Sequence, residues 1–142
     1  MNYQQDTAQK LYQLLTGFHA HSKTLEKETG LTQERLEILS QLVTLGPKTI
    51  NQLAEQEQVS APAITRTIKG LEKHGYVIKS RSKTDQRVVF VAPTRKSQQV
   101  IEALRLKQQR YIEGLLQGKS SEEVEQIAKA VERLCEVKSA GK

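Results

Sequence analysis

The sequence predicts a mainly α-helical fold that contains one small β-hairpin. Apolar residues recur at helical spacing through most of the 142 residues. Capping residues precede several of these stretches, and glycines follow them. Two short segments rich in β-branched and aromatic residues flank a polar turn in the second half of the chain. We therefore expect four helices, two strands and two further helices, in that order.

The first two helices are predicted on either side of Gly30, a residue suited to a C-terminal cap. Thr32 can cap the second helix, and Glu34 is favourable in its first turn. The Gly46-Pro47 pair ends this helix. The apolar stripe of the first helix contains Leu11, Leu14, Leu15, Phe18 and Leu25. The apolar face of the second contains Leu36, Leu39, Leu42 and Val43.

A short third helix is predicted to start after Thr49, because Thr49 and Gln52 have the spacing of a capping box. A fourth helix follows Ser60, a good N-cap, with Pro62 in the first turn, where a missing N–H costs little. Gly75 ends the fourth helix. The inward positions are Leu53 and Ala54 in the third helix, and Ile64, Ile68 and Leu71 in the fourth.

The hairpin is predicted from segments 76–82 and 87–92, which flank the turn at residues 83–86. Pro93 is expected to end the second strand, and Thr94 to cap a long helix that Gly118 breaks. Ser120 and Glu123 have the spacing of another capping box, which predicts a last amphipathic helix.

Positive charge is concentrated in one part of the chain. The net charge of the whole chain is +6. Residues 66–96 contain nine Lys and Arg against two acids, a net charge of +7, and the rest of the chain has 13 against 14, or −1. A solvated surface would tolerate such a cluster, but the cluster coincides with the fourth helix and the hairpin. This coincidence favours a binding surface for a polyanion.

The composition of the chain also argues against several other classes of protein. No apolar run is long enough to cross a membrane, and the first ten residues lack the pattern of a secretory signal. The single cysteine excludes an internal disulfide and favours a reducing, cytoplasmic location. We expect no enzyme, because no nucleophile–base pair or phosphate-binding glycine loop is present. We also expect no cofactor and no metal, since His19 and His21 are two apart and lack further ligands at a suitable spacing.

Two short helices, a third with a polar outer face and a basic hairpin together predict a winged helix-turn-helix. The second helix of such a motif enters the DNA major groove with its N-terminal residues towards the base edges. Small or polar residues there let the backbone approach, and arginine reads guanine with two donors. The predicted DNA-binding residues of this helix are Ser60, Ala61, Pro62, Ala63, Thr65, Arg66 and Lys69. Those of the wing are Arg81, Lys83, Asp85 and Arg87.

At this level the sequence resembles the MarR family of bacterial transcription regulators. The resemblance is specific across residues 49–97, TINQLAEQEQVSAPAITRTIKGLEKHGYVIKSRSKTDQRVVFVAPTRKS, and loose elsewhere. The family's wing carries Asp-x-Arg, matched by Asp85 and Arg87. Ser97 departs from the glycine of many members. The recognition helix of the family has a characteristic pattern of residues. The matching residues here are Val59, Ser60, Ile64, Thr65, Ile68, Leu71, Glu72 and Gly75.

The resemblance implies a homodimer in which helices from both ends of two chains interlock. Residues 1–142 then form a single domain, with dimerisation helices at 1–30 and 98–142 around a DNA-binding lobe at 31–97. The apolar stripes of these helices agree, because a small lobe cannot easily cover them. The resemblance also implies a small aromatic ligand, and Tyr12, His19 and Arg35 are candidates to line its site. Cys135 is expected to be a core or interface residue.

The sequence therefore predicts a dimeric, sequence-specific regulator of transcription that binds double-stranded DNA at a near-palindromic operator. By resemblance it is expected to be a repressor, with relief by a small ligand as a further expectation. Two alternatives remain open. One is an activator or architectural DNA binder without a ligand, and the other is a winged-helix adaptor whose wing contacts an acidic protein.

Overall fold

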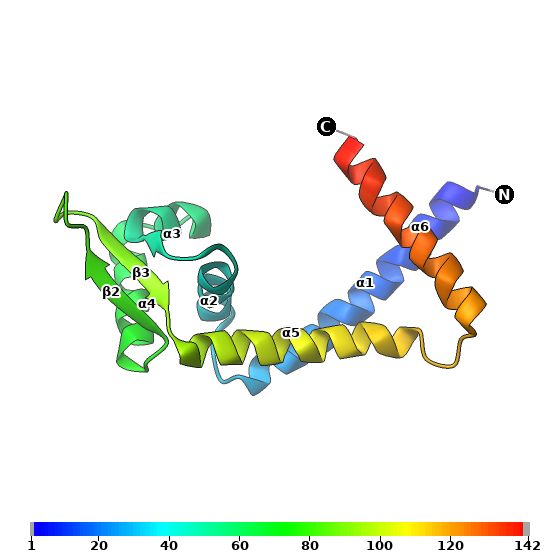
Figure 1. Ribbon diagram of the computed structural model, residues 1–142, viewed down its shortest axis with the longest axis horizontal. Helices are drawn as coiled ribbons and strands as arrows, with labels where there is room; N and C mark the ends of the chain where they lie inside the picture. The colour runs from blue at the N-terminus through cyan, green and yellow to red at the C-terminus, as the bar shows by residue number, and fades with distance from the viewer. Residues whose placement is uncertain (1, 141–142) are drawn as a thin grey trace. The chain divides into compact units, whose positions relative to one another are not determined.

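The computed structural model describes residues 2–140, and side chains over residues 2–136. This part of the chain contains six helices and three strands. Figure 1 shows their arrangement and labels the helices and the two longer strands. The helices are α1 (Tyr3–Glu28), α2 (Gln33–Leu45), α3 (Ile50–Glu57), α4 (Ala61–Lys73), α5 (Arg95–Leu115) and α6 (Ser121–Ala140). The strands are β1 (Lys48–Thr49), β2 (Val77–Arg81) and β3 (Val89–Pro93). The predicted mainly α fold is thus confirmed.

Side-chain caps fix the starts of the helices that form the helix-turn-helix. At α3, the backbone N of Gln52 donates to Thr49 Oγ1 over 3.1 Å, and that of Thr49 donates to Gln52 Oε1 over 2.9 Å. At α4, the backbone N of Ala63 donates to Ser60 Oγ over 3.2 Å. These bonds satisfy backbone donors that the first helical turn leaves without partners, as the sequence predicts.

The β structure is larger than the predicted hairpin. Strands β2 and β3 pair antiparallel, and β1 adds to the other edge of β3, which gives the order β1-β3-β2. In β1, Lys48 and Thr49 pair with Val91 and Phe90. Pro93 pairs with Val77 and is the last residue of β3, so it ends the strand as expected, one residue beyond the predicted segment 87–92. Its missing N–H is tolerated at the last position of the strand.

An aliphatic core holds α2, α3, α4 and the sheet together. It follows the predicted inward positions of α3 and α4, since Leu53, Ile64 and Leu71 are almost completely buried. Burying such a side chain contributes about 1.5–3 kcal/mol. Ile38 of α2 is fully buried as well, although it lies beside the predicted apolar face. Helix α2 is therefore covered on more than one side.

Two contacts join the end of α4 to the start of α5. Thr94 Oγ1 donates to the Gly75 carbonyl over 2.6 Å. Lys96 Nζ donates to the His74 carbonyl over 2.8 Å and lies 4.4 Å from the centre of the Tyr76 ring. The buried Ser97 hydroxyl accepts from the backbone N of Thr94 over 3.0 Å, so the serine at this family glycine position has a capping role.

The chain divides into two compact units, residues 1–108 and 109–142. In the first unit, the C-terminal half of α1 contacts α5. Gln108 Nε2 donates to Ser22 Oγ over 2.7 Å, and Leu25 is buried. The N-terminal half of α1 leaves large apolar side chains exposed, with Leu14 at 50% and Leu15 at 66%. None of the helices within residues 2–140 has the length and apolar character that crossing a membrane requires.

Candidate DNA-binding surface

Helix α4 presents one apolar and one cationic face. Ile64, Ile68 and Leu71 point into the core, while Arg66 and Lys69 are exposed on the opposite side. Lys73 is exposed one turn further along. Thr65 is exposed too, and its hydroxyl donates to the Ala61 carbonyl over 2.8 Å. The cations thus remain available to an outside partner because hydrophobic burial fixes the orientation of the helix.

The first turn of α4 is built from small residues. The Ser60 hydroxyl is engaged as the helix cap, and Ala61 and Ala63 add only methyl groups. Pro62 is exposed and carries no backbone donor. Large side chains would hold a neighbouring molecule away from the backbone here. This turn instead allows the close approach that base-edge reading requires.

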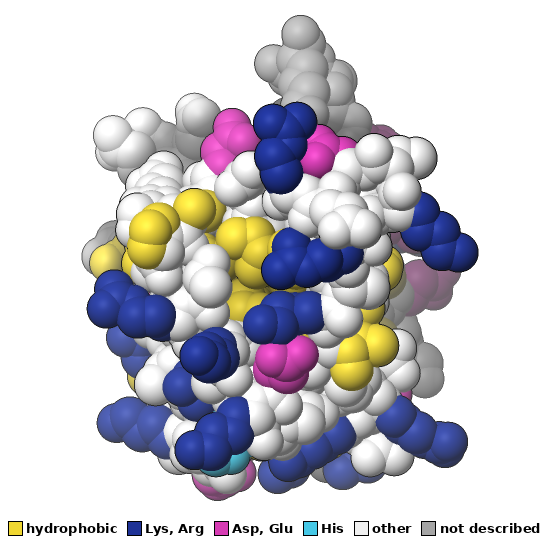
Figure 2. Space-filling view, turned by 90° about the vertical axis from the view of Figure 1, so that its left-hand side faces the viewer, with side chains coloured by type: hydrophobic (Ala, Val, Ile, Leu, Met, Phe, Trp, Pro, Cys, Tyr) yellow, Lys and Arg dark blue, Asp and Glu magenta, His cyan; other side chains and the backbone are white. Residues whose placement is uncertain are grey.

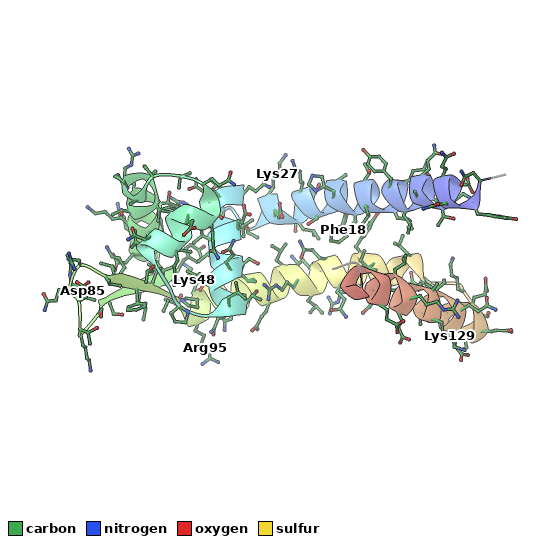
Figure 3. The ribbon with its side chains drawn as sticks, turned by 90° about the horizontal axis from the view of Figure 1, so that it is seen from above. Phe18, Lys27, Lys48, Asp85, Arg95 and Lys129 are labelled. Atoms are coloured by element: carbon green, nitrogen blue, oxygen red, sulfur yellow. The ribbon has the colours of Figure 1, made fainter. Side chains whose placement is uncertain are left out.

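Asp85 and Arg87 form a two-point ion pair at the tip of the wing (Figure 3 labels Asp85). Arg87 Nε donates to Asp85 Oδ1 over 3.1 Å, and Arg87 Nη2 donates to Oδ2 over 3.3 Å. The backbone N of Arg87 also donates to Oδ1, over 3.1 Å. These hydrogen bonds, first from the guanidinium and then from the backbone, lower the pKa of Asp85. The carboxylate orients the Arg87 side chain, which is 92% exposed.

Further hydrogen bonds order the rest of the turn. Ser82 Oγ accepts from the backbone N of Thr84 and of Asp85, each over 3.2 Å. Arg81 Nη1 donates to the Gln86 carbonyl over 2.8 Å and so spans the hairpin. Lys83 is exposed at the tip. The wing therefore presents its cations from a turn that its own side chains hold in place.

A groove brings the wing and α4 together. It has a volume of about 370 Å³, and its walls contain Thr65 from α4 and Arg81 and Arg87 from the hairpin. The other lining residues are Thr49, Ile50, Asn51, Lys79, Val88 and Val89. In Figure 2, which looks at the wing end of the molecule, Lys and Arg side chains surround a small apolar area. The fold thus brings one predicted residue of α4 and two of the wing to the same groove, whereas Arg66 and Lys69 lie outside it.

The start of α3 also lines the groove, which the sequence pattern did not predict. Thr49 and Asn51 lie there, at the positive end of the helix dipole. The capping box located this helix start, but only the fold shows that it faces the wing. Lys79, which also lines the groove, pairs with Glu72 over 3.2 Å, and Lys96 donates to the His74 carbonyl outside the groove.

A second cavity, of about 390 Å³, lies among α1, α2 and α5. Its walls contain Glu26, Leu36, Ile101 and Arg105, together with Gln33, Glu37, Ser40, Gln41, Leu104 and Gln108. Arg105 Nη2 donates to Ser40 Oγ over 3.1 Å. Within the described side chains, the buried Gln41 Oε1 has no hydrogen-bond partner. The cavity therefore combines apolar walls with polar groups of both charges.

The three candidate ligand residues do not line this cavity. Tyr12 and His19 are exposed on α1. Arg35, on α2, is half-buried and extends to Gly70 of α4. No group of three His, Cys, Asp or Glu residues suited to a metal ion occurs in the part of the chain that the structure describes.

Comparison with known proteins adds a family and a function class. A family model described as the MarR family matches residues 31–89. YdgJ of Bacillus subtilis (strain 168), named an uncharacterized HTH-type transcriptional regulator, is 30% identical over 118 residues. The match covers 83% of this chain and 72% of YdgJ.

Solved structures show the same fold over almost the whole chain. The transcriptional regulator Tm0710 from Thermotoga maritima has a TM-score of 0.85 and 23% identity, covering 96% of each chain. FabT of Streptococcus pneumoniae, solved in complex with DNA, has a TM-score of 0.63 and 19% identity, covering 99% of this chain and 100% of its own. NadR, solved with 4-hydroxyphenylacetate, has a TM-score of 0.62 and 20% identity, covering 88% and 89%.

Proposed function

Because this chain belongs to the MarR family, we propose that it is a homodimeric transcription regulator that binds double-stranded DNA at a near-palindromic operator. The observation that carries the proposal is the groove in which Thr65 of α4 faces Arg81 and Arg87 of the wing. A helix and a hairpin that carry cations towards the same side suit a duplex, whose phosphates run along both grooves.

The geometry suggests a division of labour in DNA binding. Arg66 and Thr65, on the exposed side of α4, would lie at the base edges of the major groove. Lys69 and Lys83 would contact phosphates, which fix position but carry no direct sequence information. Arg87 would enter the neighbouring minor groove, where narrow A·T-rich sequence attracts an inserted arginine. The Asp85 carboxylate would aim that side chain.

The exposed apolar residues of α1 support a homodimer. Leu11, Leu14 and Leu15 lie on this helix, with exposed fractions of 37%, 50% and 66%. A second copy of the chain would cover these side chains. It would also supply a second DNA-binding lobe, so that each lobe contacts one half-site of a near-palindrome.

The cavity among α1, α2 and α5 supports regulation by a small molecule. Its volume suits a single small ligand, and Arg105 can pair with a carboxylate. NadR, with the same fold, binds 4-hydroxyphenylacetate, a small aromatic acid. We therefore favour a repressor that a ligand of this class releases from DNA. An activator or architectural protein without a ligand is the alternative within the same class.

Selection from a pool of random duplexes tests the function directly. The expected result is an enriched, near-palindromic sequence whose binding weakens steeply as salt increases. Binding without sequence preference would favour the architectural alternative. Absence of DNA binding, together with salt-independent binding to a protein, would support the adaptor and overturn the proposal.

A further inference from the structure

The first turn of α2 contacts the helix proposed to read DNA. Thr67 Oγ1 of α4 donates to Glu34 Oε1 over 3.2 Å. The next residue, Arg35, crosses α4 at Gly70. A Cβ built on Gly70 would lie 2.7 Å from Arg35 Nη2 and 3.5 Å from Arg35 Cζ. Only the missing side chain of Gly70 leaves room for the guanidinium in this position.

This position adjoins the cationic face of α4. Gly70 is four residues after Arg66 and three before Lys73, so the three positions lie on the same side of the helix. The Arg35 guanidinium therefore lies on the side of α4 that carries these two exposed cations. Cations gathered on one side of a helix create a positive potential that attracts an anion from outside the protein.

We propose that Arg35 contacts a DNA phosphate, reaching the DNA-binding surface from α2 through the gap at Gly70. The inference rests on the proposed DNA binding and adds a residue outside the basic segment 66–96. A planar guanidinium with two parallel donors matches phosphate geometry. Arg35 thus belongs to the DNA-binding surface and not to a ligand site.

The first test measures how binding of a labelled duplex, carrying the selected sequence, depends on salt. Arg35→Gln should reduce the slope of log affinity against log salt concentration by about one for each phosphate that the variant no longer binds. At 0.15 M salt this corresponds to about fivefold weaker binding per phosphate. Arg35→Lys, which keeps the charge, should recover most of the slope.

The second test blocks the gap and leaves Arg35 in the sequence. Gly70→Ala should weaken binding like Arg35→Gln, because the new methyl group displaces the guanidinium. Its unfolding temperature should be unchanged or higher, since alanine favours the helix over glycine. In the Arg35→Gln background, Gly70→Ala should have no further effect on binding. Gly114→Ala in α5 is the matched control, because a Cβ there meets nothing within 4 Å.

The outcomes separate this inference from the proposed function. A wild-type chain that shows no salt-dependent DNA binding overturns both. If the wild type binds DNA but Arg35→Gln keeps the wild-type salt slope, only the phosphate contact is wrong, even when affinity or stability falls. A loss of binding in Gly70→Ala that persists in the Arg35→Gln background also overturns the inference.

Discussion

At the scale of single residues, Asp85 is an acid on a surface proposed to bind a polyanion. Charge alone would predict that its removal tightens DNA binding. The structure gives the carboxylate three hydrogen bonds from Arg87, two from the guanidinium and one from the backbone. Asp85 therefore restricts the conformational freedom of the Arg87 side chain at the tip of the wing.

We predict that Asp85→Ala binds the selected site more weakly, although it raises the net charge by one. The Arg87 side chain would then have to be ordered on docking, which should weaken binding roughly two- to tenfold. Binding to random duplexes should be equal or stronger. Fluorescence anisotropy on both duplexes at one salt concentration measures the difference. Equal tightening on both would show that Asp85 is a turn residue only.

The lowered pKa of Asp85 fixes the pH range of this effect. Hydrogen bonds to the charged form push the pKa below its ordinary value of 3.8. The ion pair is therefore complete above that value and is lost as pH falls through the lowered pKa. Between roughly pH 5 and 8 the Asp85 carboxylate stays ionised. The DNA affinities of the wild type and of Asp85→Ala should therefore change with pH in the same way over this range.

Arg66 is the residue expected to read a base. We predict that Arg66→Ala costs ~1–3 kcal/mol at the selected site and relaxes the preference at particular positions. Repeating the selection with the variant reveals which positions lose their preference. If binding to selected and random duplexes weakens equally, Arg66 contacts a phosphate instead.

At the scale of elements, three glutamates gather where α2 meets α3. Partial burial raises the pKa of Glu57, and the nearby charges of Glu37 and then Glu34 raise it further. Its ionised form therefore destabilises the fold at neutral pH. This penalty begins to shrink as pH falls through the raised pKa, and it disappears below 4.5, the ordinary value for the side chain.

Glu57→Gln should accordingly stabilise the protein at pH 7, by less than about 1 kcal/mol because the side chain is mostly solvated. The gain should vanish near pH 4, where the wild-type side chain is neutral as well. Chemical denaturation at the two pH values measures the difference. A gain of equal size at both would mean that packing, and not charge, is responsible.

How far the sequence predicts these elements depends on how local their causes are. Caps such as Ser60 act within one helical turn, so the start of α4 was predictable. Strand β1 was not, because two residues show no periodicity and their partners lie more than 40 positions later. Likewise, the contact of Arg35 with Gly70 depends on the crossing of α2 and α4, and no local pattern in the sequence encodes it.

At the scale of the whole molecule, we predict a dimer at micromolar concentration. Sedimentation should give twice the chain mass of 16.0 kDa. Leu15→Asp should shift the equilibrium towards monomer, because it places a charge in the apolar stripe of α1. Gln13→Asp, which adds the same charge at an exposed position of the same helix, is the control. A folded wild-type chain that sediments near 16.0 kDa would contradict the prediction.

The three-stranded sheet also affects how well the DNA-free protein resists aggregation. Strand β1 is too short to recruit another strand, so β2 is the long edge with unpaired backbone groups. Lys79 and Arg81 lie on this edge strand, where charged side chains oppose edge-to-edge pairing with the sheet of another molecule. Replacing both with neutral residues to abolish DNA binding would expose an edge ready for aggregation. The charge that we propose contacts DNA would thus also protect the regulator when it is not bound to DNA.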